Sequence, residues 1–330
     1  MKPPLFELDD FGVEIPTSQG VARPVSGLSL TLPPGRALGI VGESGSGKTV
    51  AMLAACGLMP QARVSGAVRF EGHDLLGLPA PARRALLGRH IGMVFQEPMT
   101  ALNPVMRIDR QIAEPMVTHG LMGPAAALKH AVELLDRVGI PRPDRVARRL
   151  PHELSGGMRQ RVGIAMAIAC GPRLLIADEP TTALDATVQQ QILQLLAGLR
   201  RELNMGLIMI THDLGIVGQI TDEVCVMYAG RQVEQCPTAS LFADPQHPYT
   251  LSLLGSLPQS GRQGERLYAI EGSVPSALLV MSGCRFAPRC QVARQDCMST
   301  APRLREVAML HRAACHHAPL ESVLVQGVRV

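Results

Sequence analysis

The sequence predicts an α/β fold organised around a parallel sheet. Short apolar runs at Ala37–Val41, Leu174–Ala177 and Leu207–Ile210 have the length and composition of buried strands. An amphipathic helical pattern at Val188–Leu203 separates the last two of these runs. Apolar strands that alternate with helices are typical of a parallel sheet with helices on its faces. With 46% hydrophobic and 3% aromatic residues, the chain can bury a sizeable and mainly aliphatic core.

The chain on either side of the first apolar strand adds an antiparallel region. Residues 5–32 carry period-2 apolar stretches, which predict two or three antiparallel strands. Another short strand is expected at Gly66–Gly72. A further strand at His90–Phe95 delivers Gln96 at its end.

Residues 106–150 form a predicted helical insertion. The helical patterns Ile108–His119 and Ala125–Val138 lie in this segment, which is bounded by prolines. Beyond the last apolar strand, Val224–Tyr228 and Gln232–Gln235 predict a hairpin around Gly230.

The composition changes after Pro258 to glycine, proline, arginine and cysteine with weak periodicity. We place a domain boundary at this point. The first domain comprises residues 1–258, with a helical subdomain at about 100–170, and residues 259–330 form a C-terminal extension.

The bulk properties exclude several classes of protein. The net charge of +4 is too small for a nucleic-acid-binding surface. Every uninterrupted apolar run is shorter than the roughly 18 residues that a membrane-spanning helix needs. The N-terminal residues Met1–Pro4 lack an apolar signal core. We therefore expect a cytosolic protein, or one held at a membrane by a partner.

The segment Gly42–Thr49 fits the phosphate-binding loop pattern of nucleotide-hydrolysing proteins. Its glycines let consecutive backbone N–H groups surround phosphate oxygens, and Lys48 can reach the β- and γ-phosphates. The Thr49 hydroxyl suits Mg²⁺, which prefers oxygen ligands. The residues assigned to nucleotide binding here are Gly42, Glu43, Ser44, Gly45, Ser46, Gly47, Lys48 and Thr49.

A second anion-binding pattern lies more than 100 residues further on, at Leu154–Arg161. Ser155 can cap the apolar helix that follows, while Gly156 and Gly157 expose backbone N–H groups at its positive end. An ordinary helix cap is the alternative interpretation of these residues. The candidate binding residues are Ser155, Gly156, Gly157 and Met158.

Polar residues at the ends of apolar strands supply the candidate catalytic groups. Asp178 can hold Mg²⁺, and Glu179 can orient and polarise the attacking water. Gln96 fits a sensor of Mg²⁺ and water, and His212 can hydrogen-bond the γ-phosphate and hold Glu179 in line. The loop from Thr181 to Asp185 can reach a neighbouring subunit.

These motifs resemble, in order and spacing, the nucleotide-binding subunits of ABC transporters over roughly residues 5–258. The resemblance implies a P-loop ABC ATPase with a RecA-like mixed sheet, an antiparallel β subdomain and a helical subdomain. It also implies a head-to-tail dimer that holds ATP and Mg²⁺ between the phosphate loop of one chain and Ser155–Met158 of the other. The family usually places an aromatic ring for adenine near Ile15, which is aliphatic; Phe11 is the nearest ring, and no stacking residue is named.

Three segments are similar to the oligopeptide, dipeptide and nickel importer branch of this family: Gln96–Pro104, Gly156–Met158 and His247–Thr250. Such importers commonly pair two paralogous ATPases, and Ser46 resembles the first of the pair, so we expect a heterodimer. The resemblance also implies two membrane permease subunits and an extracytoplasmic substrate-binding protein. The chain would lie peripherally at the cytoplasmic face of the inner membrane.

Four cysteines lie in the C-terminal extension. This extension also resembles that of the importer branch, some members of which hold a 4Fe–4S cluster at these cysteines. They are Cys284, Cys290, Cys297 and Cys315. Zinc, with His311, His316 or His317 as further ligands, and no metal at all remain alternatives. The other cysteines, expected in the core, are Cys56, Cys170, Cys225 and Cys236.

The sequence therefore leads to an ATPase that energises import of di- or oligopeptides. Import of nickel or a metal chelate is the alternative within the same family. A soluble ABC-type ATPase that acts on nucleic acid or the ribosome is a different class, and a regulatory ATPase with the cysteine segment as a metal sensor is a third. Co-purification with two membrane subunits would separate the importer from the nucleic-acid class.

Overall fold

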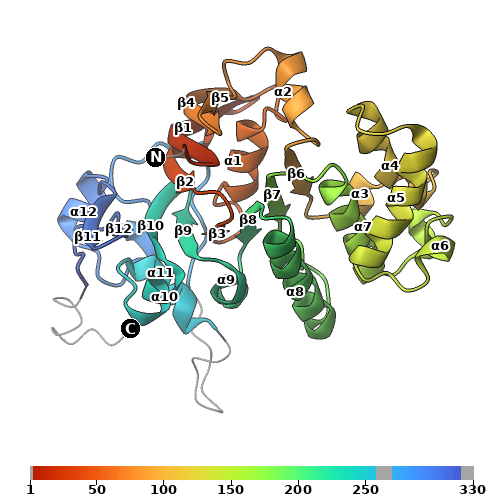
Figure 1. Ribbon diagram of the computed structural model, residues 1–330. Coiled ribbons are helices and arrows are strands. Elements are labelled where there is room, and N and C mark those ends of the chain that lie inside the picture. Colours follow the sequence, from red (N-terminus) through yellow and green to blue (C-terminus); the bar gives the residue numbers. More distant parts are fainter. Residues whose placement is uncertain (1–2, 258–269, 321–330) are drawn as a thin grey trace. The chain divides into compact units, whose positions relative to one another are not determined.

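The computed structural model describes residues 3–257 and 270–320, and the chain forms two compact units (Figure 1). The first unit contains Leu32–Arg36 and Gly77–Met209, together with the N-terminal residues up to Leu5. The second contains Phe6–Thr31, Ala37–Leu76 and the chain from Ile210 onward. The candidate site residues are therefore divided between two units.

Buried parallel strands form the centre of the first unit. Its strands follow the order β8-β7-β6, with bounds Gly206–Thr211, Leu174–Asp178 and Ile91–Val94; β8 begins in this unit. Strands β6 and β7 pair in parallel, with Val94 opposite Ala177. All residues of β7 are buried, as an apolar strand covered on both faces requires. The strands predicted from the apolar runs are thus confirmed.

Helices make up the rest of the first unit. The predicted helical insertion contains α4 and α5, which pack on each other and on α7 (Figure 1). Ile108, Ile112 and Met116 recur at helical spacing along α4 and are all fully buried. The helices are α2 (Ala80–Leu86), α3 (Pro98–Ala101), α4 (Ile108–Thr118), α5 (Pro124–Arg137), α6 (Pro143–Val146), the 3₁₀ turn η1 (Pro151–Glu153), α7 (Gly156–Ile168) and α8 (Ala186–Glu202).

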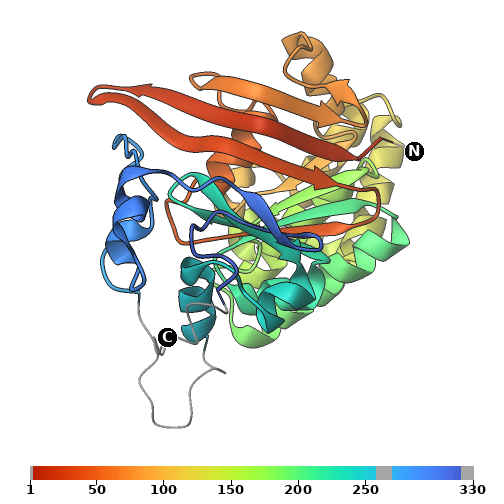
Figure 2. The ribbon, with the colours of Figure 1, turned by 90° about the vertical axis from the view of Figure 1, so that its left-hand side faces the viewer.

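An antiparallel sheet opens the second unit, as the period-2 pattern predicts. Its strand order is β2-β1-β4-β5, and Figure 2 shows the long red hairpin of β1 and β2 beside the orange β4. Phe6 lies opposite Phe70, and Leu8 lies opposite Val68, with all four side chains buried. The bounds are β1 (Phe6–Thr17), β2 (Gly20–Leu32), β4 (Arg63–Phe70) and β5 (His73–Asp74).

A second sheet in this unit carries the phosphate loop. Its order is β11-β12-β10-β9-β3, in which β3 and β9 are parallel and the other pairs are antiparallel. The bounds are β3 (Ala37–Val41), β9 (Glu223–Tyr228), β10 (Arg231–Pro237), β11 (Arg305–Ala308) and β12 (His311–Ala313). The remaining elements are α1 (Lys48–Ala55), α9 (Leu214–Ile220), α10 (Thr238–Ala243), α11 (Pro248–Gly255), the 3₁₀ turn η2 (Ala287–Arg289) and α12 (Gln295–Ser299).

The predicted hairpin of β9 and β10 is confirmed, and β12 extends it with a strand that the sequence did not predict. Glu234 of β10 pairs with Ala313 of β12. The predicted domain boundary at residue 258 lies outside the described residues. No helix among the described residues is long and apolar enough to cross a membrane.

Candidate functional site

The phosphate loop Gly42–Thr49 connects β3 to the start of α1 in the second unit. Gly47 caps α1 with φ of 94°, and a Cβ there would lie 2.1 Å from the carbonyl oxygen of Pro24. A Cβ on Gly42 would lie 2.1 Å from the carbonyl oxygen of Met227. Both positions therefore require glycine, because any larger residue would displace the neighbouring backbone.

Lys48 lies in this loop with its ammonium group directed at the loop itself. Its Nζ donates to the carbonyl oxygens of Gly42 (2.6 Å) and Glu43 (2.9 Å) and to Ser46 Oγ (3.2 Å). Lys48 is 5% exposed, and Ser46 is fully buried. Ser44 and Gly45 are exposed at the rim, and Thr49 is half-buried in the first turn of α1. The arrangement concentrates positive charge where consecutive N–H groups of the loop can meet an anion.

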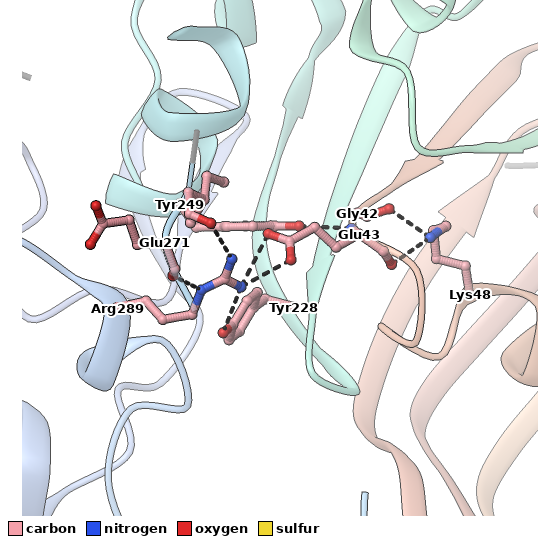
Figure 3. A network of polar contacts seen from close by, with 8 residues as sticks. Gly42, Glu43, Lys48, Tyr228, Tyr249, Glu271 and Arg289 are labelled. Atoms are coloured by element: carbon pink, nitrogen blue, oxygen red, sulfur yellow. Dashed lines mark hydrogen bonds and ion pairs between the residues drawn. The ribbon is translucent and has the colours of Figure 1, made fainter. Parts of the chain in front are cut away.

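Glu43 has polar contacts that the motif does not predict (Figure 3). Its carboxylate accepts from Arg289 Nη1, with N–O distances of 3.2 and 2.9 Å. Its backbone N–H donates to the hydroxyl of Tyr249 over 2.8 Å. Both partners lie more than 200 positions further along the chain, so no local signal in the sequence could have identified them.

The first unit places Gln96, Asp178 and Glu179 at the same end of a parallel strand pair, because Gln96 follows β6 and Asp178 ends β7. Gln96 Nε2 donates to Glu179 Oε2 over 3.3 Å, and Thr182 Oγ1 donates to the same oxygen over 2.8 Å. Asp178 is 2% exposed. The structure thus brings Gln96 and Thr182 together on the Glu179 carboxylate, a contact that the sequence did not predict.

The segment Ser155–Met158 opens α7, as expected. Ser155 is the N-cap and accepts from the backbone N–H of Met158 over 3.4 Å. Ser155 and Gly156 are exposed, whereas a Cβ on Gly157 would lie 2.8 Å from Val188 of α8. The helix start is therefore packed against α8 on one side and accessible on the other.

Asp185 lies at the start of a helix in the first unit, and His212 follows the end of a strand in the second unit. Asp185 is the N-cap of α8, and its carboxylate accepts from the backbone N–H of Val188 over 2.9 Å. His212 is exposed and follows β8 in the second unit, which also holds the phosphate loop. Phe11, the aromatic ring nearest the expected adenine position, is fully buried within β1 and cannot stack on a base.

The four late cysteines line one small cavity in the second unit, together with His316 and His317. Burial and the neighbouring thiols raise the pKa of Cys290 to about 12 and that of Cys315 to about 11. Protonated thiols are poor metal ligands, so binding of a cation here would be coupled to proton release.

The C-terminal part of the second unit also contains compact groups of metal-ligating side chains. The close ligand groups among the described residues are Glu234–Cys236–His311 and Asp296–Cys297–His317, and neither contains two of the four late cysteines. Four thiols and two imidazoles around one cavity are soft ligands of the kind that suit either an iron–sulfur cluster or zinc.

Three of the other cysteines are core residues, as predicted. Cys56, Cys225 and Cys236 are at most 1% exposed, and burial raises the pKa of Cys56 to about 12. Cys170 differs from the prediction, because it is half-buried where the chain leaves α7.

Two family models match this chain. A family model described as ABC transporter matches residues 25–182, and one described as oligopeptide/dipeptide transporter, C-terminal region, matches residues 233–297. The chain is similar to the oligopeptide transport ATP-binding protein OppD of Salmonella typhimurium, with 45% identity over 97% of this chain and 95% of the relative.

It is also 49% identical to OppD of Mycobacterium tuberculosis over 94% of this chain, but it spans only 52% of that relative. The chain thus spans about half the length of the mycobacterial relatives it matches.

Two solved structures resemble the fold. The first is the ATP-binding cassette MJ0796, in a dimeric post-hydrolysis state bound to ADP and Pi, with a TM-score of 0.64, 25% identity and coverage of 71% of this chain and 98% of that one. The second is cbiO1 of Clostridium perfringens, part of an ABC transporter complex, with a TM-score of 0.63, 27% identity and coverage of 74% and 92%.

Proposed function

Because this chain belongs to the ABC transporter family, in its oligopeptide and dipeptide branch, we propose that it hydrolyses ATP to energise import of di- or oligopeptides across the inner membrane. The observation that carries hydrolysis is the Glu179 carboxylate, which Gln96 and Thr182 hold at the end of β7. The names of the relatives favour a peptide cargo over nickel or a metal chelate.

The proposed roles follow from the chemistry of each group. The phosphate loop binds the ATP phosphates through its backbone N–H groups and Lys48. The Thr49 hydroxyl, the Asp178 carboxylate and the Gln96 amide supply oxygen ligands for Mg²⁺. Glu179 orients the water that attacks the γ-phosphate, and His212 donates to that phosphate.

A second chain completes the site. In this proposal Ser155–Met158 and Asp185 of one chain meet the ATP held by the other, head to tail. The exposure of Ser155 and Gly156 at the positive end of α7 supports this, as does the dimeric ADP-bound state of the similar cassette. We further propose that the second chain is a paralogous ATPase, because Ser46 resembles the first member of the ATPase pair in such importers.

The complex contains further partners in this proposal. They are two permease subunits in the membrane and an extracytoplasmic substrate-binding protein, and the ATPase lies peripherally at the cytoplasmic face. ATP binding closes the dimer and release of the products reopens it, which moves the permeases between two states.

The cysteine cavity holds a 4Fe–4S cluster in this proposal, with Cys284, Cys290, Cys297 and Cys315 as ligands. Their position around one common cavity supports a single group that all four thiolates hold. Bound there, the group would crosslink η2, α12 and the segment after β12. The described residues around it would then be ordered by ligation as well as by packing.

The function is tested by Glu179→Gln in the full complex, reconstituted in lipid vesicles with its permeases and binding protein. We expect ATP to bind and a closed dimer to accumulate, while hydrolysis and peptide uptake fall by at least about 100-fold, in the range of a lost general base. Glu133→Gln on α5 is the matched control and keeps both rates. Hydrolysis at the wild-type rate in Glu179→Gln would refute the catalytic assignment, and uptake without ATP would refute the coupling.

A further inference from the structure

Arg289, in the C-terminal segment, contacts the phosphate loop. This residue ends the 3₁₀ turn η2 and immediately precedes Cys290. The guanidinium lies against the Glu43 carboxylate, and the two side chains are 7% and 26% exposed (Figure 3). An ion pair at this level of burial is screened by solvent less than a surface pair is.

Arg289 is held in place by several acceptors at once. Its Nε donates to the carbonyl oxygen of Glu271 over 2.8 Å, and Nη2 donates to that of Ile270 over 3.1 Å. Its Nη1 also donates to the Tyr228 hydroxyl over 3.2 Å, and the guanidinium lies 5.7 Å from the centre of the Tyr228 ring. A planar guanidinium can satisfy these partners together, whereas the ammonium of lysine cannot.

The same region fixes the backbone of Glu43. Tyr249 accepts the Glu43 N–H, and its ring lies 4.7 Å from that of Tyr228. Phe286 packs on both tyrosines, at 5.1 and 5.4 Å between ring centres. The aromatic cluster thus contacts both Arg289 and the backbone at Glu43.

The charge of Glu43 makes this contact relevant to nucleotide binding. A carboxylate within a phosphate-binding loop repels the phosphates that the loop must bind. Lys48, which attracts them, donates to the carbonyl oxygen of Glu43 itself. A cation that pairs with the Glu43 carboxylate removes this repulsion, and Arg289 is in that position.

We propose that Arg289 is a positioning residue of the nucleotide site, which neutralises Glu43 and holds it away from the bound phosphates. The inference rests on the proposed role of Gly42–Thr49 as the phosphate loop. It gives the C-terminal segment a part in ATP binding, since loss of its contact with Glu43 weakens the affinity for nucleotide without touching Glu179.

The test is equilibrium binding of Mg²⁺·ADP to the purified full chain by calorimetry, because ADP avoids hydrolysis and dimer closure. Arg289→Met should weaken binding by about 10-fold, the order expected for an unpaired charge near the phosphates. In a Glu43→Gln background the same substitution should weaken ADP binding by no more than about twofold, because the carboxylate that Arg289 neutralises is absent. Arg294→Met, an exposed arginine of the same segment, is the matched control for the change in net charge.

Ionic strength gives a second readout that a merely structural role would not move. Raising the salt from about 0.1 M to about 1 M shortens the screening length from about 10 Å to about 3 Å, so the penalty in Arg289→Met should shrink. Arg289→Lys, which keeps the charge, should lie between wild type and Arg289→Met. If Arg289→Met does not fold, the test is made with Arg289→Lys instead. Its loss of ADP affinity relative to wild type should then shrink as the salt concentration rises.

Two results would overturn the proposal. One is an affinity for ADP in Arg289→Met equal to that of wild type. The other is an equal loss of affinity with and without the Glu43 carboxylate, which would mean that Arg289 only supports the fold. Failure of the wild-type chain to bind ADP at all would instead refute the proposed function.

Discussion

Single glycines in the phosphate loop differ in what they contribute. Gly47 and Gly45 both have positive φ, at 94° and 79°. A Cβ on Gly47 would meet the carbonyl oxygen of Pro24 at 2.1 Å, whereas a Cβ on Gly45 has no neighbour within 4 Å. The first position combines backbone strain with a clash, and the second carries strain alone.

We therefore predict that Gly47→Ala is far more damaging than Gly45→Ala. The left-handed conformation costs an alanine about 1–2 kcal/mol in either variant, and the displaced backbone at Gly47 adds at least about 2 kcal/mol more. Urea unfolding of both variants measures the difference. Equal destabilisation would contradict the geometry of the loop.

At the scale of elements, a buried hydrogen-bonded pair of side chains joins β10 to β12. His311 Nε2 lies 2.7 Å from Glu234 Oε1, and the two residues are 3% and 0% exposed. The backbone N–H of Gln246 donates to the same oxygen over 2.6 Å. The carboxylate depends on these partners, because a buried charge without them is costly.

His311→Ala should consequently destabilise the protein by about 3–5 kcal/mol, since it leaves Glu234 without its imidazole partner. Adding Glu234→Gln should recover part of that loss, because an amide is less costly to bury than a charge. Arg312→Ala, at the exposed neighbouring position of β12, is the control and should change stability by less than about 0.5 kcal/mol. Denaturant midpoints compare the variants, and a midpoint for His311→Ala equal to that of Arg312→Ala would contradict a role for the pair.

At the scale of the whole molecule, the proposed cluster would order the C-terminal segment. We expect the anaerobically purified chain to be brown and to carry about four iron atoms, and chelation of the iron to lower its melting temperature. Cys290→Ser should lose both colour and iron, while Cys170→Ser, which changes a cysteine outside the cavity, should keep them. A colourless anaerobic chain without iron would refute the cluster.

Much of the fold could be predicted from the sequence because its signals are local. The apolar strand Leu174–Asp178 and the helical spacing of Ile108, Ile112 and Met116 are encoded in consecutive residues. The phosphate loop is likewise eight neighbouring residues whose types specify its chemistry. Strands β11 and β12 were missed because they are short and lack a clear period.

By itself, then, the sequence determined the central strands, the helical insertion, the phosphate loop and the candidate catalytic groups of this member of the ABC transporter family. Only the tertiary structure decided that Arg289 pairs with Glu43, 246 positions earlier, and that four dispersed cysteines line one cavity. A hydrophobic periodicity indicates which face of a segment is buried, but it does not indicate which distant side chain packs against that face. That choice depends on the path of the whole chain, and it placed a C-terminal arginine beside the loop proposed to bind the phosphates.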